Sequence, residues 1–249
     1  ENFYDQDLKK IEYPVIVKPV DQGAAIGIHI CHNEKELIDA YKDAMEKSFC
    51  KEVIVEQYIV GDEFSAAYTV INGEYKLSTM GDKYLNRDQK GFIPLPEAYV
   101  YPSKHLDNYL ENISPNVVNM FRSIGLVNGT VFVQGVTDGT HTALFEAGLR
   151  MGGTALFRFV SNINNINILH LLVDYSLTGK MEADISLEDP YLKGKRCCLL
   201  SLLNGGGKIG KIDGVEKAAA VEGVVEHVVR YKEGETILKS GTLKQSHIR

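Results

Sequence analysis

Two short apolar runs in this chain end at a charged residue, and a third contains one. Residues 15–17 lead into Lys18, residues 53–55 lead into Glu56, and a later apolar run contains Glu146. Short β-branched runs bounded by turn residues are typical of strands. Charged side chains are almost never fully buried unless they are paired, so Glu146 in particular needs a partner or a ligand.

Between these runs the chain alternates helical and extended patterns. Asn33 followed by Glu36 is a capping-box signal, and the apolar residues after it predict a helix over 34–47. Extended patterns predict a strand at 26–31 and a hairpin around Asn72-Gly73. Further strands are expected over 130–136 and 142–147, and further helices over 106–124, with a break at Ser114-Pro115, and over 165–177.

Other segments carry weaker patterns. Residues 83–102 are polar with three prolines and predict an irregular excursion. The helix over 165–177 is expected to bury one face, formed by Ile166, Leu169, Leu172, Val173 and Ser176. Near the C-terminus, segments 197–203, 224–231 and 236–238 are expected as strands around a short helix at 215–221.

Composition excludes several classes of protein. The 33 acidic residues outnumber the 27 basic ones, and no long basic block is present, so no nucleic-acid partner is expected. No apolar run approaches the roughly 20 residues of a membrane span, so no membrane association is expected. The cysteines, at 31, 50, 197 and 198, lack metal-ligand spacing and favour a reducing cytoplasm. The missing initiator Met leads us to expect an excised piece of a longer protein.

Lys18 is the first residue with a chemical interpretation. A lysine that ends a buried strand, followed by a small-residue loop to Gly27, offers a charge and backbone N–H groups to a polyphosphate. Alone, this pattern specifies function loosely, and a solvated strand-end lysine is the ordinary alternative. Glu56 and Glu63 likewise have the alternative of being solvated charges, and Arg150 that of pairing only with Glu146.

Three stretches in order resemble the signatures of ATP-grasp enzymes. They are residues 13–19, residues 56–63, and residues 145–153 preceded by Gln134 on a partner strand. The resemblance implies an α+β fold with a nucleotide-binding region over 1–183, in which two α+β subdomains, at 13–80 and 81–183, clamp a nucleotide. It leaves a small, mostly β C-terminal domain at 184–249.

The resemblance also implies roles for individual residues. Lys18 would contact phosphates, the connector after Glu56 would hold adenine through main-chain groups, and Glu63 would hold the ribose. The complete nucleotide-binding set is Lys18, Gly27, Glu56, Gln57, Tyr58, Ile59 and Glu63.

The metal and catalytic residues follow from the same resemblance. Gln134 and Glu146 would hold Mg²⁺ or Mn²⁺, Arg150 would stabilise a phosphorylated intermediate, and Lys83 would reach the terminal phosphate of ATP. The implied activity is ATP-dependent activation of a carboxylate as an acylphosphate, which an amine then attacks. The implied partners are small-molecule carboxylate and amine substrates, and a homodimer is left open.

Three departures from the family pattern favour alternatives. The phosphate loop has Ala24-Ala25-Ile26 where a hydroxyl and a basic residue are usual, Gln134 replaces a Glu, and Gly148 replaces an Asn. Losing anionic oxygen weakens a site for a hard cation. The alternatives are an ATP-binding regulatory or assembly module without turnover, or a carbamoyl phosphate synthetase-like fragment. We expect this piece to bind ATP or ADP with Mg²⁺ and to ligate poorly if at all.

Strand register decides whether the metal pair exists. Side chains alternate between the faces of a strand, so Gln134 and Glu146 share a face only with the right parity between them. A two-residue turn at Asp138-Gly139 would separate them. We expect a three-residue loop over 137–139 that pairs Gln134 with Thr142, or another odd-length loop or bulge of the same parity.

Overall fold

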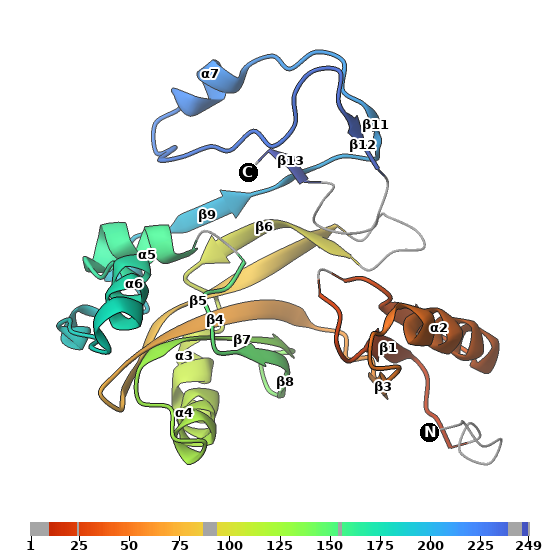
Figure 1. Ribbon diagram of the computed structural model, residues 1–249, viewed down its shortest axis with the longest axis horizontal. Coiled ribbons are helices and arrows are strands. Elements are labelled where there is room, and N and C mark those ends of the chain that lie inside the picture. The colour runs from red at the N-terminus through yellow and green to blue at the C-terminus, as the bar shows by residue number, and fades with distance from the viewer. Residues whose placement is uncertain (1–9, 24, 87–93, 154–155, 239–245, 249) are drawn as a thin grey trace. The chain divides into compact units, whose positions relative to one another are not determined.

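The computed structural model describes residues 10–23, 25–86, 94–153, 156–238 and 246–248 (Figure 1). The chain forms two compact units. The first unit contains the described parts of 1–59, 85–97 and 201–249, and the second contains those of 60–84 and 98–200. In the described part of the chain, no helix combines the length and apolar character needed to cross a bilayer.

The first unit contains a small three-stranded sheet covered by one helix. The order is β2 (His29–Cys31), β1 (Val15–Pro19), β3 (Val53–Gln57), and both pairings are antiparallel. The helix α2 (Glu34–Lys47) has the bounds that the sequence predicts, and it packs Leu37, Ala40 and Ala44 against the buried residues of β1.

Local hydrogen bonds explain why α2 begins where it does. Asn33 Oδ1 accepts the Glu36 N–H at 3.0 Å, and the Glu36 carboxylate accepts the His32 N–H at 2.8 Å. These bonds satisfy backbone donors that a helix start leaves unpaired. The strand expected at 26–31 begins only at His29, because Gly27 takes a left-handed conformation with φ of 72° and interrupts the extended chain.

The C-terminal segment of the first unit contains short ladders. β10 (Leu202–Leu203) pairs with β13 (Ser246–Ile248), and β11 (Gly207–Lys208) pairs with β12 (Thr236–Ile237). The helix α7 (Val215–Ala219) lies between them in sequence. The strand expected at 224–231 was wrong: no strand forms there, and its valines are exposed. An apolar pattern becomes a strand only where a neighbouring strand completes the ladder.

A six-stranded sheet forms the centre of the second unit. Its strand order is β8 (Thr142–Gly148), β7 (Gly129–Thr137), β4 (Asp62–Ile71), β5 (Glu74–Asn86), β6 (Leu95–Tyr101), β9 (Cys197–Leu200). The predicted hairpin is confirmed: Ile71 pairs with Glu74 around Asn72 and Gly73, whose φ values of 51° and 81° are those of a type I′ turn.

Helices pack on both faces of this sheet. On one face lie α3 (Leu106–Asn108), a π-helical turn (Tyr109–Ile113) and α4 (Ser114–Ser123), against Phe64, Tyr68 and Val131 (Figure 1). On the other lie α5 (Leu156–Asn164) and α6 (Ile168–Thr178), with the 3₁₀ turns Ile185–Leu187 and Leu192–Gly194 nearby in sequence. Ser114 and Pro115 begin α4, as predicted.

Two expectations in this unit fail, and one helix was missed. The excursion at 83–102 is replaced by the continuation of β5 and by β6, because Leu95, Tyr99 and Tyr101 are buried in the sheet; residues 87–93 lie outside the described chain. The helix α5 was not predicted. In α6, Ile168 and Leu171 are buried and the expected Leu172 packs against them, whereas the expected Leu169, Val173 and Ser176 are exposed. Because apolar residues lie on more than one side of this helix, their spacing did not determine which side is buried.

The compact units do not coincide with the expected boundaries near residues 80 and 183. β4 pairs along its length with β7, and β9 pairs with β6, so both strands belong to the second unit. The assignment of functional domains stays a prediction.

Candidate active site

The pairing of β7 with β8 brings Gln134 directly opposite Glu146. From the turn the register is Thr137 with Thr142 and Gly135 with Leu144, and it then shifts by one residue. The three-residue loop was wrong, because the loop has four residues, 138–141. The shift restores the parity that this loop would otherwise lose, so the two side chains share a face as expected.

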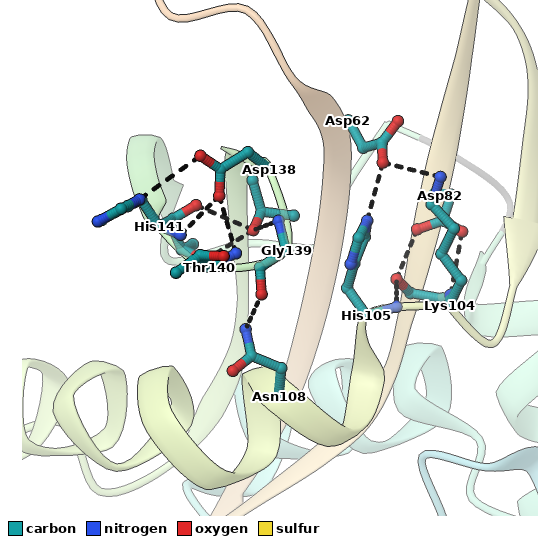
Figure 2. Close-up of polar contacts among 12 residues, drawn as sticks. Asp62, Asp82, Lys104, His105, Asn108, Asp138, Gly139, Thr140 and His141 are labelled. Carbon is teal, nitrogen blue, oxygen red and sulfur yellow. Dashed lines mark hydrogen bonds and ion pairs between the residues drawn. The ribbon is translucent and has the colours of Figure 1, made fainter.

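Asp138 determines the shape of this four-residue loop. Its Oδ1 accepts the N–H groups of Thr140 and His141 at 2.8 and 2.7 Å (Figure 2). Gly139 follows with φ of 92°, a conformation that suits glycine. An aspartate that bonds the backbone two and three residues ahead stabilises a turn longer than the dipeptide suggests.

Lys83 lies at the centre of one cluster of polar and charged side chains in the second unit. Its Nζ donates to Gln134 Oε1 at 2.6 Å and lies 3.3 Å from Glu63 Oε2. The ammonium also lies 5.2 Å from the centre of the Phe145 ring. The Lys83 side chain is only 6% exposed, whereas that of Glu63 is 27% exposed. β5, β4, β7 and β8 therefore each contribute a group to one cluster.

Burial and charge act in opposite directions on Lys83. Burial lowers the pKa of its ammonium below the usual value, while attraction to Glu63 and Glu146 raises it. The lowering dominates. Because desolvation costs more than the two carboxylates return, this ammonium gains from additional anionic contacts.

Arg150 lies beside the metal pair and stacks on an aromatic ring. Its guanidinium carbon is 4.4 Å from the centre of the Phe132 ring, and Nη2 is 3.7 Å from Glu146 Oε1. Nη1 donates to the Met151 carbonyl at 3.0 Å. The side chain is 60% exposed, so the pairing with Glu146 leaves most of the guanidinium accessible.

Packing around Gly148 explains why β8 offers no metal ligand besides Glu146. A Cβ at this position would lie 2.2 Å from Phe132 Cε1, far closer than carbon atoms approach. Phe132 therefore fills the space that an Asn side chain at position 148 would need.

The donor set fits a magnesium ion that is shared with a nucleotide. An amide oxygen and a carboxylate lie directly opposite each other, and Mg²⁺ is commonly bound by one or two protein oxygens together with substrate phosphates. Within the described residues, no group of three or more His, Cys, Asp or Glu side chains is arranged to hold a metal alone. Gln134 and Glu146 are the residues that would hold the ion.

The candidate residues of the first unit form their own arrangement. Lys18 pairs with the Glu56 carboxylate across β1 and β3. Tyr58 donates its backbone N–H to the Pro14 carbonyl at 2.9 Å, so that N–H is already satisfied. A Cβ at Gly27 would lie 2.8 Å from Pro19 Cγ, so the backbone at Gly27 packs tightly against the end of β1. The phosphate and adenine roles stay predictions.

Sequence reasoning missed a second polar group at the start of β4. Asp62 accepts hydrogen bonds from Lys104 Nζ at 2.7 Å and from His105 Nε2 at 2.9 Å (Figure 2). These two hydrogen bonds lower the pKa of the Asp62 carboxyl, and the one from Lys104 has the larger effect. The adjacent Lys104-His105 pair carried no signal for this contact.

Phe132 and Phe145 were also missed as aromatic neighbours of Arg150 and Lys83, although Phe145 adjoins Glu146 in sequence.

The overall fold is similar to that of solved ATP-grasp proteins. An L-amino acid ligase from Bacillus licheniformis superimposes with a TM-score of 0.76 at 23% identity, covering 98% of this chain and 58% of that one. The biotin carboxylase domain of 2-oxoglutarate carboxylase from Hydrogenobacter thermophilus, solved with MgADP, gives 0.70 at 17% identity, covering 98% and 53%. The ATP-grasp fold implied by the sequence is thus confirmed.

The sequence itself is more specific. A family model described as D-ala D-ala ligase C-terminus matches residues 1–126, and the chain belongs to this family. A D-alanine–D-alanine ligase from Pediococcus pentosaceus is 31% identical over 149 residues, which are 58% of this chain and 41% of that ligase. The chain thus spans less than half the length of this relative.

Proposed function

We propose that the intact protein is an ATP- and Mg²⁺-dependent ligase. It would convert a small-molecule carboxylate into an acylphosphate, which an amine substrate then attacks. The observation that carries this proposal is the convergence of Lys83, Gln134, Glu146 and Arg150, with Gln134 opposite Glu146. Membership of the ligase family and the names of the relatives support the same reaction class.

The task of such a site is to position a phosphoryl group and to balance its charge. Mg²⁺, when bound, would neutralise the phosphates and polarise the transferring group. Arg150 keeps an accessible guanidinium beside Glu146 and would stabilise charge on the phosphorylated intermediate. Lys83 would meet the terminal phosphate, because its buried ammonium gains from additional anionic oxygens.

The first unit would contribute groups to nucleotide binding. Lys18 would exchange its pairing with Glu56 for phosphate oxygens, and the backbone around Gly27 would contribute N–H groups. The main-chain groups of residues 57–59 would hold adenine, with the exception of the Tyr58 N–H, which Pro14 already accepts. A cytoplasmic location and a homodimer stay predictions of the same proposal.

One observation favours a second candidate, an ATP-binding module without turnover. Phe132 fills the space beside Gly148, so β8 offers Glu146 as its one metal ligand within this pair of strands. A site with fewer anionic ligands binds Mg²⁺ less tightly. The carbamoyl phosphate synthetase-like alternative rests on Gln134 alone.

Phosphate release by the intact protein separates these candidates. The protein is assayed with ATP, Mg²⁺ and a panel of amino acids offered singly and in pairs. The ligase predicts release that depends on both a carboxylate and an amine, and a loss of about 100-fold or more in kcat for Arg150→Met, the scale for removing a charge-stabilising donor. Arg122→Met, at the end of α4, is the matched control. Nucleotide binding without any amine-dependent release would instead support the module.

A further inference from the structure

The amide oxygen of Gln134 already has a cationic partner. Lys83 Nζ donates to Gln134 Oε1 at 2.6 Å, the shorter of its two contacts with oxygen atoms of the cluster. Gln134 is also one of the two proposed metal ligands. The same oxygen atom therefore accepts a hydrogen bond from Lys83 and would also have to coordinate the metal ion of the proposed function.

Lys83 is held at this place by several groups. Glu63 Oε2 lies 3.3 Å from its Nζ, the Phe145 ring lies below it at 5.2 Å, and the Glu146 charge attracts it. The Lys83 side chain is 6% exposed, so water solvates its ammonium little, and contacts within the protein provide most of its stabilisation. A buried charge that loses its partners is strongly disfavoured, and Lys83 moves only if other anionic groups replace them.

We propose that Lys83 occupies the metal position in the nucleotide-free protein, so that a divalent ion enters only together with nucleotide phosphates. Mg²⁺ binds its oxygen ligands at about 2.0 to 2.1 Å and cannot share one amide oxygen with an ammonium donor on the same side. The Lys83 ammonium and a divalent ion that both contacted Gln134 Oε1 would also repel each other. Phosphate oxygens supply the anionic contacts to which Lys83 turns, and this movement frees the Gln134 oxygen for the ion.

The inference makes metal and nucleotide binding strongly coupled. Coupling between two ligands is reciprocal, so the nucleotide strengthens metal binding by the same factor by which the metal strengthens nucleotide binding. Lys83 is the group that creates part of this coupling. Removing its charge should therefore tighten metal binding without nucleotide and weaken the coupling. The inference rests on the proposed metal site of Gln134 and Glu146.

The test is a titration of the chain with Mn²⁺, in which free Mn²⁺ is measured by electron paramagnetic resonance, without and with adenylyl imidodiphosphate, a non-hydrolysable ATP analogue that keeps the terminal phosphate. The titration with the analogue is corrected by the same titration without protein. The variants are Lys83→Met, which keeps the length of the side chain, and Lys104→Met as matched control. Like Lys83, Lys104 pairs with a carboxylate of β4. Its partner is Asp62, outside the proposed metal site, and its side chain is more than half exposed.

The expected result is that the wild-type chain and Lys104→Met bind Mn²⁺ weakly without the analogue and much more tightly with it. Lys83→Met should bind one Mn²⁺ without the analogue at least about tenfold more tightly than wild type, the scale of removing one charged hydrogen bond from a competing partner. Its ratio of Mn²⁺ affinities with and without the analogue should be lower than that of wild type by a similar factor. Lys83→Gln, which keeps a donor but no charge, serves as the second variant if Lys83→Met does not fold.

Two results would overturn the inference, and they differ in what they leave standing. Equal Mn²⁺ affinity of wild type and both Lys83 variants without the analogue, together with Mn²⁺ binding that the analogue strengthens, removes the role of Lys83 and leaves the proposed ligase site intact. If the analogue strengthens Mn²⁺ binding in no variant, both the inference and the metal site on which it rests are removed.

Discussion

The second unit carries two polar clusters on the same face of its sheet, and they differ in how their hydrogen bonds are satisfied. We call Thr69, Ser78, Asn164 and Glu188 the inner cluster, and Glu63, Lys83, Gln134 and Glu146 the open cluster. Thr69 pairs with Thr130 and Ser65 with Gln134 along the regular β4–β7 ladder, and positions 130 and 134 share a face.

In the inner cluster the chain itself satisfies the carboxylate. Glu188 is 8% exposed, and it accepts from Thr69 Oγ1 at 2.6 Å, Ser78 Oγ at 2.8 Å and Asn164 Nδ2 at 3.1 Å. In the open cluster Lys83 Nζ lies 3.3 Å from Glu63 Oε2 and attracts Glu146 through its charge. The Glu146 side chain is 47% exposed, and Arg150 Nη2 lies 3.7 Å from its Oε1.

The difference indicates distinct roles for similar residue types. The buried Glu188 carboxylate stabilises the fold, because three buried donors of the chain share it as their acceptor. Accessible carboxylates beside a desolvated ammonium leave acceptor positions for a ligand. Substitutions in the inner cluster should therefore change the free energy of unfolding, whereas substitutions of ligand-facing charges should change binding.

The largest effect is expected for Glu188→Ala. Three buried donors would lose their acceptor, and the free energy of unfolding should fall by about 3 to 5 kcal/mol. Urea unfolding at neutral pH measures this change. Glu182→Ala, a substitution of an exposed glutamate just before the same segment, should stay within about 0.5 kcal/mol of wild type. A loss below about 1 kcal/mol for Glu188→Ala would contradict the structural role of the inner cluster.

Lys18→Ala should show the opposite balance, because Lys18 is proposed to face the nucleotide. Its loss should weaken binding of Mg²⁺-ATP by about 1.5 to 3 kcal/mol, the scale of hydrogen bonds to charged groups. The free energy of unfolding without ligand should change by less than about 1 kcal/mol, since the Lys18–Glu56 pair is partly exposed. Calorimetric titration and urea unfolding of the same samples give both numbers. Equal losses in both would make Lys18 a structural residue only.

Features that depend on neighbouring residues could be predicted from the sequence. The bounds of α2 follow from Asn33, Glu36 and the apolar spacing after them, and the hairpin follows from Asn72-Gly73. Each signal lies within a few residues of the structure that it determines. The charged residues Lys18, Glu56 and Glu146, at or within apolar runs, were visible for the same reason.

Features that depend on distant pairing could not be predicted. The register shift beside Gln134 results from fitting β8 to β7, and the Lys83–Gln134 contact requires β5 and β7 to flank β4. The apolar residues of 224–231 resemble a strand, but only the fold decides whether a partner strand exists. Gly148 was seen as a lost ligand, and its packing against Phe132 became visible only in three dimensions.

Gly148→Ala tests the region between the two clusters. Its methyl group would overlap the Phe132 ring, which is 2% exposed and has little room to move. Overpacking of this kind should cost about 1 to 3 kcal/mol. Gly153→Ala is the control, since a Cβ there meets no atom within 4 Å. Adding Phe132→Leu to Gly148→Ala should recover part of the loss, and purely additive effects would show that the two residues do not compete for space.

The smallest effect is expected for Asp62→Asn, at the exposed start of β4. Hydrogen bonds from Lys104 and His105 hold the pKa of the Asp62 carboxyl below its usual value of 3.8. A carboxyl with a lower pKa in the folded state adds stability above the unfolded pKa, and this contribution is lost as the pH falls through the folded pKa. Because the side chain is 47% exposed, the loss in Asp62→Asn at pH 6 should stay below about 1 kcal/mol.

The difference between wild type and Asp62→Asn should then shrink as the pH is lowered from about 5 towards 3 and below, because protonation removes the charge in wild type that the variant already lacks. Urea midpoints at several pH values measure it. Asp174→Asn, on the exposed side of α6, controls for the general effect of losing a negative charge. A difference that grows on acidification would mean that Asp62 is stabilised in its protonated form, contrary to the contacts with Lys104 and His105.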